Sequence, residues 1–187
     1  KNIQEGGVSR NRWRRPAQSM DWSFGYKAML VVLFVPSVLG LAGAAACGGS
    51  GGGSAGEEHY VAGRALQQQN RLEETIAAYD EAIRLNPASV RAFAGRGDAF
   101  YAQGSFRQAM EDYDQSISLK SNLKSLASSP EYASHKNALA EAYIGRALIE
   151  TACGDDLEAQ RNLAQVAEIG FDPAEAREAI EAIKAKR

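Results

Sequence analysis

The feature that most constrains this chain is an internal repeat with a fixed step, equal to the separation of Gly63 and Gly97, which runs from Gly56 to Ser121. Shifting the sequence by that step superimposes identical residues: Gly63 on Gly97, Ala65 on Ala99, Gln69 on Gln103, Tyr79 on Tyr113, Asp80 on Asp114, Ile83 on Ile117 and Leu85 on Leu119. Within each copy, two runs of apolar and small residues follow a helical period and are separated by a polar break. Each copy is therefore predicted to form a helix, a tight turn and a second helix.

A step of this length, about 34 residues, combined with a helix-turn-helix pattern resembles the tetratricopeptide repeat. The residues that carry the resemblance are Gly63, Leu66, Tyr79, Ala82 and Pro87 in the first copy, and Phe93, Gly97, Phe100, Ala109, Tyr113 and Ser116 in the second. The small residues would let paired helices approach closely, and the tyrosines would fill the volume between pairs. Ala62 and Arg96 depart from the pattern, since both stand where leucine is usual. The resemblance implies an all-α, antiparallel helix-pair solenoid.

A third, degenerate copy follows. Aligning Gly154 with Gly104 places Ala147 under Gly97 and Leu163 under Tyr113, after an insertion that makes this step longer than the one before. The predicted helical domain covers 57–187, with repeats at 57–87, 90–121 and 130–171 and a C-terminal capping helix at 173–186. About three helix pairs plus this cap are expected, because each pair buries its apolar face only against its neighbours. The sequence Ser129-Pro130-Glu131 predicts a capped start for the long helix of the third copy.

The first 46 residues differ in composition from the rest. Residues 1–27 hold six basic and two acidic residues, and a basic, polar, disordered region is predicted there. Residues 28–46 contain no charge and begin with an apolar run, which predicts a secretory signal peptide or a membrane anchor. The basic residues would then be the side that stays in the cytoplasm. A basic patch for nucleic acid or phospholipid is the alternative for residues 12–15.

Cys47 follows three alanines and precedes a Gly/Ser tether, predicted at 47–56. This arrangement resembles a bacterial lipoprotein signal, in which the thiol of Cys47 would take a diacylglycerol and hold the chain on a membrane. Ala44 departs from that family, which prefers leucine three positions before the cysteine. Cleavage at Ala46 without lipidation, or a permanent anchor at 28–46, are the alternatives. The predicted location is the extracytoplasmic face of a cell membrane.

No catalytic residue, cofactor or metal site is predicted. His59 and His135 are the only histidines, and neither has further ligands at the spacing that zinc needs. The glycines of 48–53 lack the Lys-Ser/Thr of a phosphate-binding loop. Residues 28–187 hold 15 basic and 21 acidic residues, which disfavours nucleic acid as a partner.

The resemblance implies an inner groove lined by the second, fifth, ninth and twelfth to thirteenth residues of each copy's first helix, and Glu141 is the second such residue of the third copy. The candidate partner-binding residues on this groove are Tyr60, Arg64, Gln67, Arg91, Asp98, Tyr101, Ile144 and Leu148. Cover of Ile144 and Leu148 by the chain's own 121–129 segment is an equally weighted alternative. The predicted function is a membrane-anchored adaptor that binds a protein partner, as a peptide or a helix, on the extracytoplasmic side of a bacterial envelope, without catalysis. A self-associating structural module of the envelope is the alternative.

Overall fold

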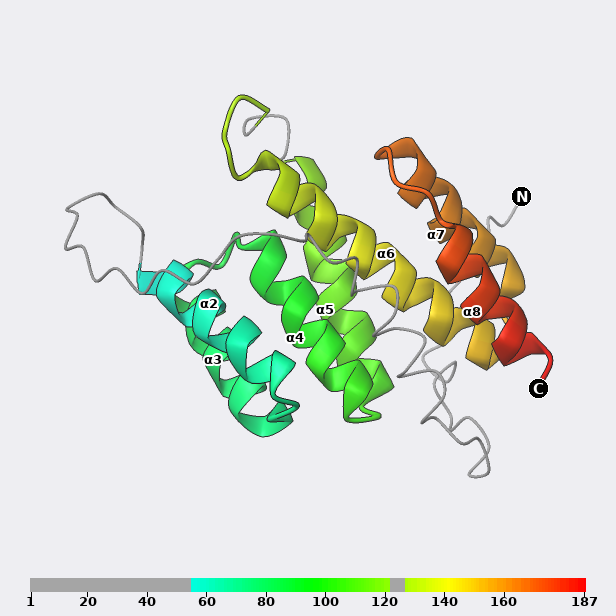
Figure 1. Cartoon of the computed structure of the whole chain (residues 1–187), viewed down its shortest axis with the longest axis horizontal. Helices are drawn as coiled ribbons and strands as arrows, with labels where there is room; N and C mark the ends of the chain where they lie inside the picture. Colours follow the sequence, from blue (N-terminus) through cyan, green and yellow to red (C-terminus); the bar gives the residue numbers. More distant parts are fainter. Residues whose placement is uncertain (1–54, 122–126) are drawn as a thin grey trace, which may run out of the picture.

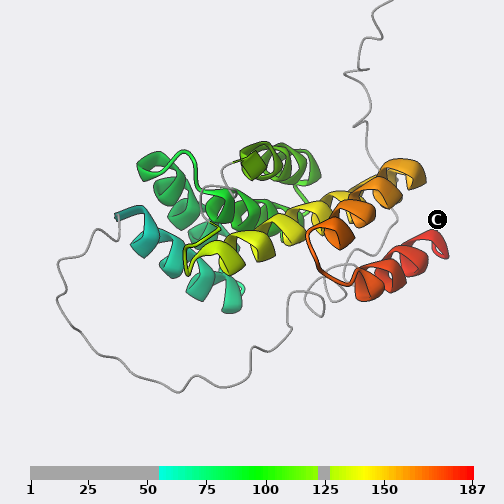
Figure 2. The ribbon, with the colours of Figure 1, turned by 90° about the horizontal axis from the view of Figure 1, so that it is seen from above.

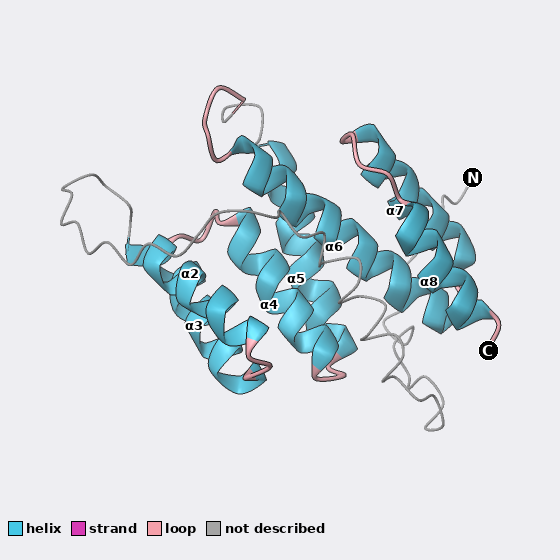
Figure 3. Ribbon diagram, in the orientation of Figure 1, coloured by secondary structure: helices cyan, strands magenta, loops and turns pink. Residues whose placement is uncertain are grey.

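The computed structural model describes residues 55–121 and 127–187, and in these ranges it contains helices but no strand (Figure 3). The helices are α2 (Ala55–Gln68), α3 (Leu72–Leu85), α4 (Val90–Ala102), α5 (Phe106–Ser118), α6 (Tyr132–Cys153), α7 (Asp156–Glu168) and α8 (Ala174–Lys184). The all-α prediction is thereby confirmed. The predictions for residues 1–54, including the lipidation of Cys47, lie outside the described residues.

The helices form three pairs in a row, α2–α3, α4–α5 and α6–α7, followed by α8 (Figure 1). Figure 2 shows the same order from above, with α8 in red at the C-terminal edge. The first helices of successive pairs contact one another, α2 with α4, α4 with α6, and α6 with α8, whereas the second helices make no comparable mutual contacts among the described elements. The row therefore has its first helices on the inner side, as the predicted helix-pair solenoid requires.

Tyr79 of α3 forms the joint between the first and second pairs. Its ring is fully buried and lies between Gly63 of α2 and Gly95 of α4. A Cβ atom added to either glycine would come within 2.8 Å or less of the ring. Real Cβ atoms do not tolerate such contacts, so the two glycines are what allows three helices to meet around one tyrosine.

Tyr113 of α5 repeats this joint between the second and third pairs. It lies between Gly97 of α4 and Gly145 of α6, and a Cβ atom at Gly97 would be 2.7 Å from its Cε1. The insertion between the copies therefore leaves the joint unchanged. At the next position of the series stands Leu163 of α7, a smaller side chain than tyrosine.

Arg96 of α4 explains one departure from the repeat pattern. Its guanidinium pairs with Asp80 of the preceding pair at 2.5 Å and with Asp112 of its own pair at 2.6 and 2.8 Å. Two positions of the first pair correspond to Arg96 and Asp112, and both hold alanine, Ala62 and Ala78. Since no described helix precedes α2, an arginine at position 62 would lack the partner that Asp80 provides for Arg96.

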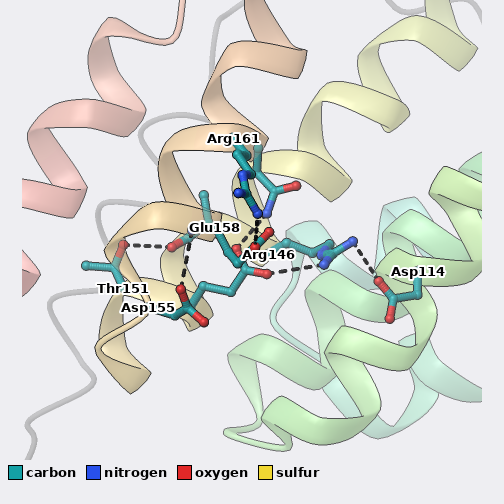
Figure 4. A network of polar contacts seen from close by, with 9 residues as sticks. Asp114, Arg146, Thr151, Asp155, Glu158 and Arg161 are labelled. Atoms are coloured by element: carbon teal, nitrogen blue, oxygen red, sulfur yellow. Dashed lines mark hydrogen bonds and ion pairs between the residues drawn. The ribbon is translucent and has the colours of Figure 1, made fainter. Parts of the chain in front are cut away.

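Arg146 of α6 carries the same link to the third pair. It lies 2.9 Å from Asp114, the residue that corresponds to Asp80 (Figure 4). Its second partner differs, because Glu150 of α6 takes the role of Asp112 at 3.2 Å. Asn162 of α7 stands at the position of Asp112 and donates to Glu150 at 2.6 Å. The buried acidic partner therefore lies on the second helix of the pair for Arg96 (Asp112) and on the first helix for Arg146 (Glu150). Each arginine still has two acidic partners.

The helix boundaries differ from the predictions at two points. α2 begins at Ala55, so the last two residues assigned to the tether belong to the first helix, and Gly56 is buried against α3. The predicted capped start of α6 is wrong: Glu131 is the N-cap without a side-chain hydrogen bond, and Ser129 Oγ accepts only from the Glu131 amide at 3.2 Å. Much of the insertion lengthens α6, which has 22 residues against 13 in α4, before Gly154 ends it with a φ of 90°.

α8 packs on α6 through Ala176, Ile180 and Ile183, as a terminal cap should. It makes few or no contacts with α7. A cavity of about 430 Å³ lies between α7 and α8, with Ala159, Leu163 and Ile180 among its apolar lining residues. The last junction of the row is therefore less tightly packed than those centred on the two tyrosines.

Candidate functional site

We call the inner face the surface formed by the second, fifth and ninth residues of α2, α4 and α6, counted in repeat register. These are Glu57, Tyr60 and Arg64 on α2, Arg91, Ala94 and Asp98 on α4, and Glu141, Ile144 and Leu148 on α6. Spacings of three and four residues place each set on one side of its helix, and the contacts between the three helices bring the sets together.

Glu57, Tyr60 and Arg91 form a closed group at one edge of the inner face. Arg91 donates to both carboxylate oxygens of Glu57, and its guanidinium lies 4.6 Å from the centre of the Tyr60 ring. Only 11% of the Arg91 side chain is exposed. These contacts neutralise Glu57 and hold Tyr60 and Arg91 in place, so these two predicted contact residues mainly join α2 to α4.

Arg64 and Gln67 of α2 are the more accessible of the predicted residues. The Arg64 side chain is exposed, whereas Gln67 is half-buried and accepts a hydrogen bond from the Tyr79 hydroxyl at 2.9 Å. Of the eight predicted partner-binding residues, Arg64 is the one whose side chain is exposed.

Asp98 is a buried carboxyl group at the centre of the inner face. Only 4% of the residue is exposed, and Oδ1 accepts a hydrogen bond from the Tyr113 hydroxyl at 2.8 Å. Burial raises the pKa of Asp98 well above its ordinary value, and the neighbouring Glu141 raises it further, while the Tyr113 hydroxyl and Arg64 act in the opposite direction.

Glu141 faces Asp98 from α6 and was not among the eight candidates. Burial raises the pKa of Glu141 from 4.5 to about 7, and Arg64 opposes the shift. The repeat alignment placed Glu141 at an inner position, but only the packing of α6 against α4 shows that it shares an environment with Asp98. An ionised Glu141 makes ionisation of Asp98 less favourable.

Tyr101, Ile144 and Leu148 are three of the predicted partner-binding residues, and all three are buried in the main hydrophobic cluster. Their exposed fractions are 4%, 8% and 1%. The ring of Tyr101 meets that of Phe106 edge-on at 5.5 Å. These side chains fill the space between α4 and α6, so as they stand they offer little contact area to a partner.

The two histidines lie apart, His59 on α2 and His135 on α6. His135 is buried with Nδ1 2.9 Å from the Glu131 carbonyl, and His59 is half-buried. Within residues 55–121 and 127–187, no three histidine, cysteine, aspartate or glutamate side chains are grouped to hold a metal ion. The helices of the described part include none with the length and apolar character that crossing a membrane requires.

Two known repeat families match part of the chain. The family described as "TPR repeat" matches residues 63–104, and the family described as "Tetratricopeptide repeat" matches residues 90–123. Residues 63–123 match tetratricopeptide repeats. The second tetratricopeptide match begins at Val90, the first residue of α4, and continues past the end of α5. No curated protein matches the chain.

The third helix pair lies beyond these two tetratricopeptide matches, but it continues the same packing. Gly145 and Arg146 of α6 contact Tyr113 and Asp114 of α5, just as Gly95 contacts Tyr79 and Arg96 contacts Asp80. Tetratricopeptide repeats commonly bind other proteins, so the matches at residues 63–123 suggest a protein partner.

Proposed function

We propose that this protein is a membrane-anchored adaptor that binds a segment of a partner protein on its inner face and does no chemistry itself. The coarser part of this proposal, an interaction module, follows from the tetratricopeptide repeats at residues 63–123. The finer part assigns the binding surface to α2, α4 and α6 and the location to the extracytoplasmic side of a bacterial membrane.

The observation that carries the proposal is the convergence of ionisable side chains from three successive helices. Arg64 comes from α2, Asp98 from α4 and Glu141 from α6, at inner positions of three helices that contact one another in succession. Polar groups of this kind, arranged on a curved surface built from a rigid core, favour recognition of an extended segment over a flat contact.

Partner binding is tested with the full chain carrying Arg64→Ala, compared with Arg107→Ala as the matched control. Arg107 is equally exposed but belongs to α5, on the other side of the helix pair. Affinity purification after cross-linking in membranes of the native host should recover a common partner with wild type and Arg107→Ala, and several-fold less with Arg64→Ala. Equal recovery of the partner with all three proteins would contradict the proposal that the inner face is the binding surface.

Membrane anchoring is proposed from residues 28–54, which lie outside the described residues. Cys47→Ser should move the protein from the membrane fraction to the soluble extracytoplasmic fraction, because two or more acyl chains hold a protein firmly on a membrane and a single serine holds none. Metabolic labelling with a radioactive fatty acid provides the direct readout. Retention of Cys47→Ser in the membrane would indicate that the 28–46 segment is an uncleaved anchor.

A further inference from the structure

The last junction of the row contains an open groove between α7 and α8, which we call the C-terminal groove. Its volume is about 430 Å³, within the range of about 300–1,000 Å³ that is common for binding clefts. The buried residues that line it are apolar, and they include Ala159 and Leu163 of α7 and Ile180 of α8. Exposed residues form its rim, among them Ala164 of α7 and Arg177 of α8. Figure 2 shows α8 set apart from α7 at this end of the row.

At the two earlier joints, a helix packs where the C-terminal groove lies open. α4 contacts α3 and α6 contacts α5, whereas α8 contacts α6 and makes few or no contacts with α7. The incoming helix brings a glycine to the tyrosine of the preceding pair, Gly95 to Tyr79 and Gly145 to Tyr113. The fold itself therefore shows that this side of a second helix accepts another helix, and α7 has that side uncovered.

The residues of α7 that line the groove indicate the shape of the helix that would fill it. In repeat register, Leu163 stands at the position of Tyr113 and Ala164 at the position of Asp114. Leucine fills less volume than tyrosine, so the incoming helix must bring a bulky apolar side chain where the earlier joints have a glycine. Asp114 pairs with Arg146 of the next helix at 2.9 Å, and Ala164 offers no such partner. An arginine at that place is therefore not required.

The rim of the C-terminal groove carries one positive charge that is not balanced. Lys184 pairs with Glu181 at 2.8 Å, and Arg187 pairs with Asp156 at 3.0 Å. Arg177 also lines the groove, is exposed, and forms no ion pair with another residue in the described part of the chain. A carboxylate complements this rim, because a guanidinium can donate two parallel hydrogen bonds to it.

From these observations we infer that the C-terminal groove docks an amphipathic helix of a partner protein. A bulky apolar side chain of that helix would pack on Leu163 and Ile180, and an aspartate or glutamate would pair with Arg177. The groove follows α7 from Asp156 to Ala164, about two helical turns or roughly 12 Å, which matches a short helical segment. The inference goes beyond the proposed function, since this surface lies at the end of the row and not on the inner face.

The test uses a phage-displayed library of small helical proteins, in which one exposed helix is randomised, panned against the full chain in detergent. Wild type should enrich helices that carry a large apolar residue and, within two turns, an aspartate or glutamate. Ala164→Arg puts a long charged side chain into the groove and should weaken binding of the enriched proteins at least about tenfold. Ala77→Arg is the matched control, since Ala77 is an exposed alanine of α3 outside the groove, and it should bind them as wild type does.

The charge of the rim has a test of its own. Selection on Arg177→Glu should enrich lysine or arginine in place of the acidic residue, and this variant should bind the proteins selected on wild type about tenfold more weakly. Arg107→Glu reverses an exposed arginine of α5 and should keep the preference for an acidic residue. Circular dichroism during thermal melting shows that each variant is folded. A reversed preference cannot come from misfolding, so it identifies Arg177 as the contact.

Photo-cross-linking in membranes of the native host shows what occupies the groove there. With p-benzoylphenylalanine in place of Ala164, the full chain should cross-link to a segment of another protein that carries apolar and acidic residues at helical spacing. The same replacement at Ala77 should give several-fold less of this product.

Four results would overturn the inference. These are equal binding of the selected proteins to wild type and Ala164→Arg, an unchanged acidic preference with folded Arg177→Glu, no cross-link at position 164 above that at position 77, and a cross-link to a second copy or to residues 1–54 of the same chain. None of them concerns the inner face, which the Arg64→Ala experiment tests separately.

Discussion

One tyrosine side chain packs at each of the first two joints between helix pairs. Tyr79 and Tyr113 each have helix backbone on two sides at glycine positions, so the same side chain packs its own helix pair and the next one. The tyrosine hydroxyls are also satisfied, by Gln67 and Asp98 respectively. A substitution at a glycine beside either tyrosine should therefore disturb the packing of two helix pairs.

Gly97→Leu should destabilise the protein by about 1–3 kcal/mol, because the new side chain enters the space held by the Tyr113 ring. Urea denaturation followed by circular dichroism measures the loss. Ala65→Leu places the same side chain at an exposed position of α2 and should leave the free energy of unfolding nearly unchanged. Equal stability of Gly97→Leu and wild type would contradict the packing described at this joint.

The second prediction at the residue scale concerns pH and Glu141. The described groups that interact electrostatically with Glu141 are Tyr60 and Arg64 from α2, Tyr79 from α3, Asp98 from α4 and Tyr113 from α5. Because the pKa of Glu141 is raised from 4.5 to about 7 on folding, the folded state binds more protons than the unfolded state between these values. The contribution of this group is thus present below pH 4.5 and is lost as the pH rises through 7.

Glu141→Gln removes that titration while keeping the shape of the side chain. Between pH 5 and pH 8, the free energy of unfolding of wild type should fall relative to that of Glu141→Gln by up to about 3 kcal/mol. Urea denaturation at each pH measures the difference, with Glu58→Gln as the control that follows wild type. Parallel curves for wild type and Glu141→Gln would show that Glu141 titrates normally in the folded protein.

At the scale of helices, the links between pairs are ion pairs that can be followed from one copy to the next. Arg96 joins α3, α4 and α5, and Arg146 joins α5 and α6 with the help of Asn162. The first pair holds alanine at both positions that correspond to Arg96 and Asp112. The alanine pair shows that the fold tolerates loss of both partners together.

Arg96→Ala should cost about 2–4 kcal/mol, because it leaves the carboxylate of Asp112 buried without a partner. The double variant Arg96→Ala with Asp112→Ala should recover at least about 1 kcal/mol relative to the sum of the single changes. Chemical denaturation of the four proteins gives the coupling energy. A coupling near zero would show that the two side chains contribute independently.

The sequence predicted the helices better than their ends. The repeat step and the glycine and tyrosine positions predicted the first four helices, and Gly154 correctly marks the end of α6. The capping signal around Ser129 was misleading, because α6 begins only at Tyr132 and Ser129 Oγ accepts from the Glu131 amide in the turn before the helix. Ala55 is a similar case, since burial of Gly56 against α3 starts the helix before the tether composition ends.

At the scale of the whole molecule, the helix-pair solenoid followed from the repeat, but the accessibility of its inner face did not. The repeat register put the eight candidates on first helices, yet Tyr101, Ile144 and Leu148 are buried and Arg91 is held by Glu57. Accessibility depends on the distance between neighbouring first helices, which no pattern in one copy encodes. The electrostatic effect of Glu141 on Asp98 depends on the same distance.

Self-association is the alternative function and belongs to this scale. Val61 of α2 is 56% exposed and lies on the first helix of the described row. We expect the full chain in detergent to sediment as a monomer over a hundredfold range of concentration, as an adaptor would. Dimers that form with increasing concentration and disappear with Val61→Lys, but not with the α7 variant Leu157→Lys, would favour the structural module instead.

The packing between α7 and α8 makes the two ends of the helix row differ in stability. Tyr79 and Tyr113 hold their neighbours together, whereas an open groove of about 430 Å³, lined in part by Leu163, lies between α7 and α8. Thermal or mechanical loss of structure should then begin by fraying at the C-terminal end and travel back toward the first pair. A chain held at its other end would keep its binding surface longest where it is closest to the anchor.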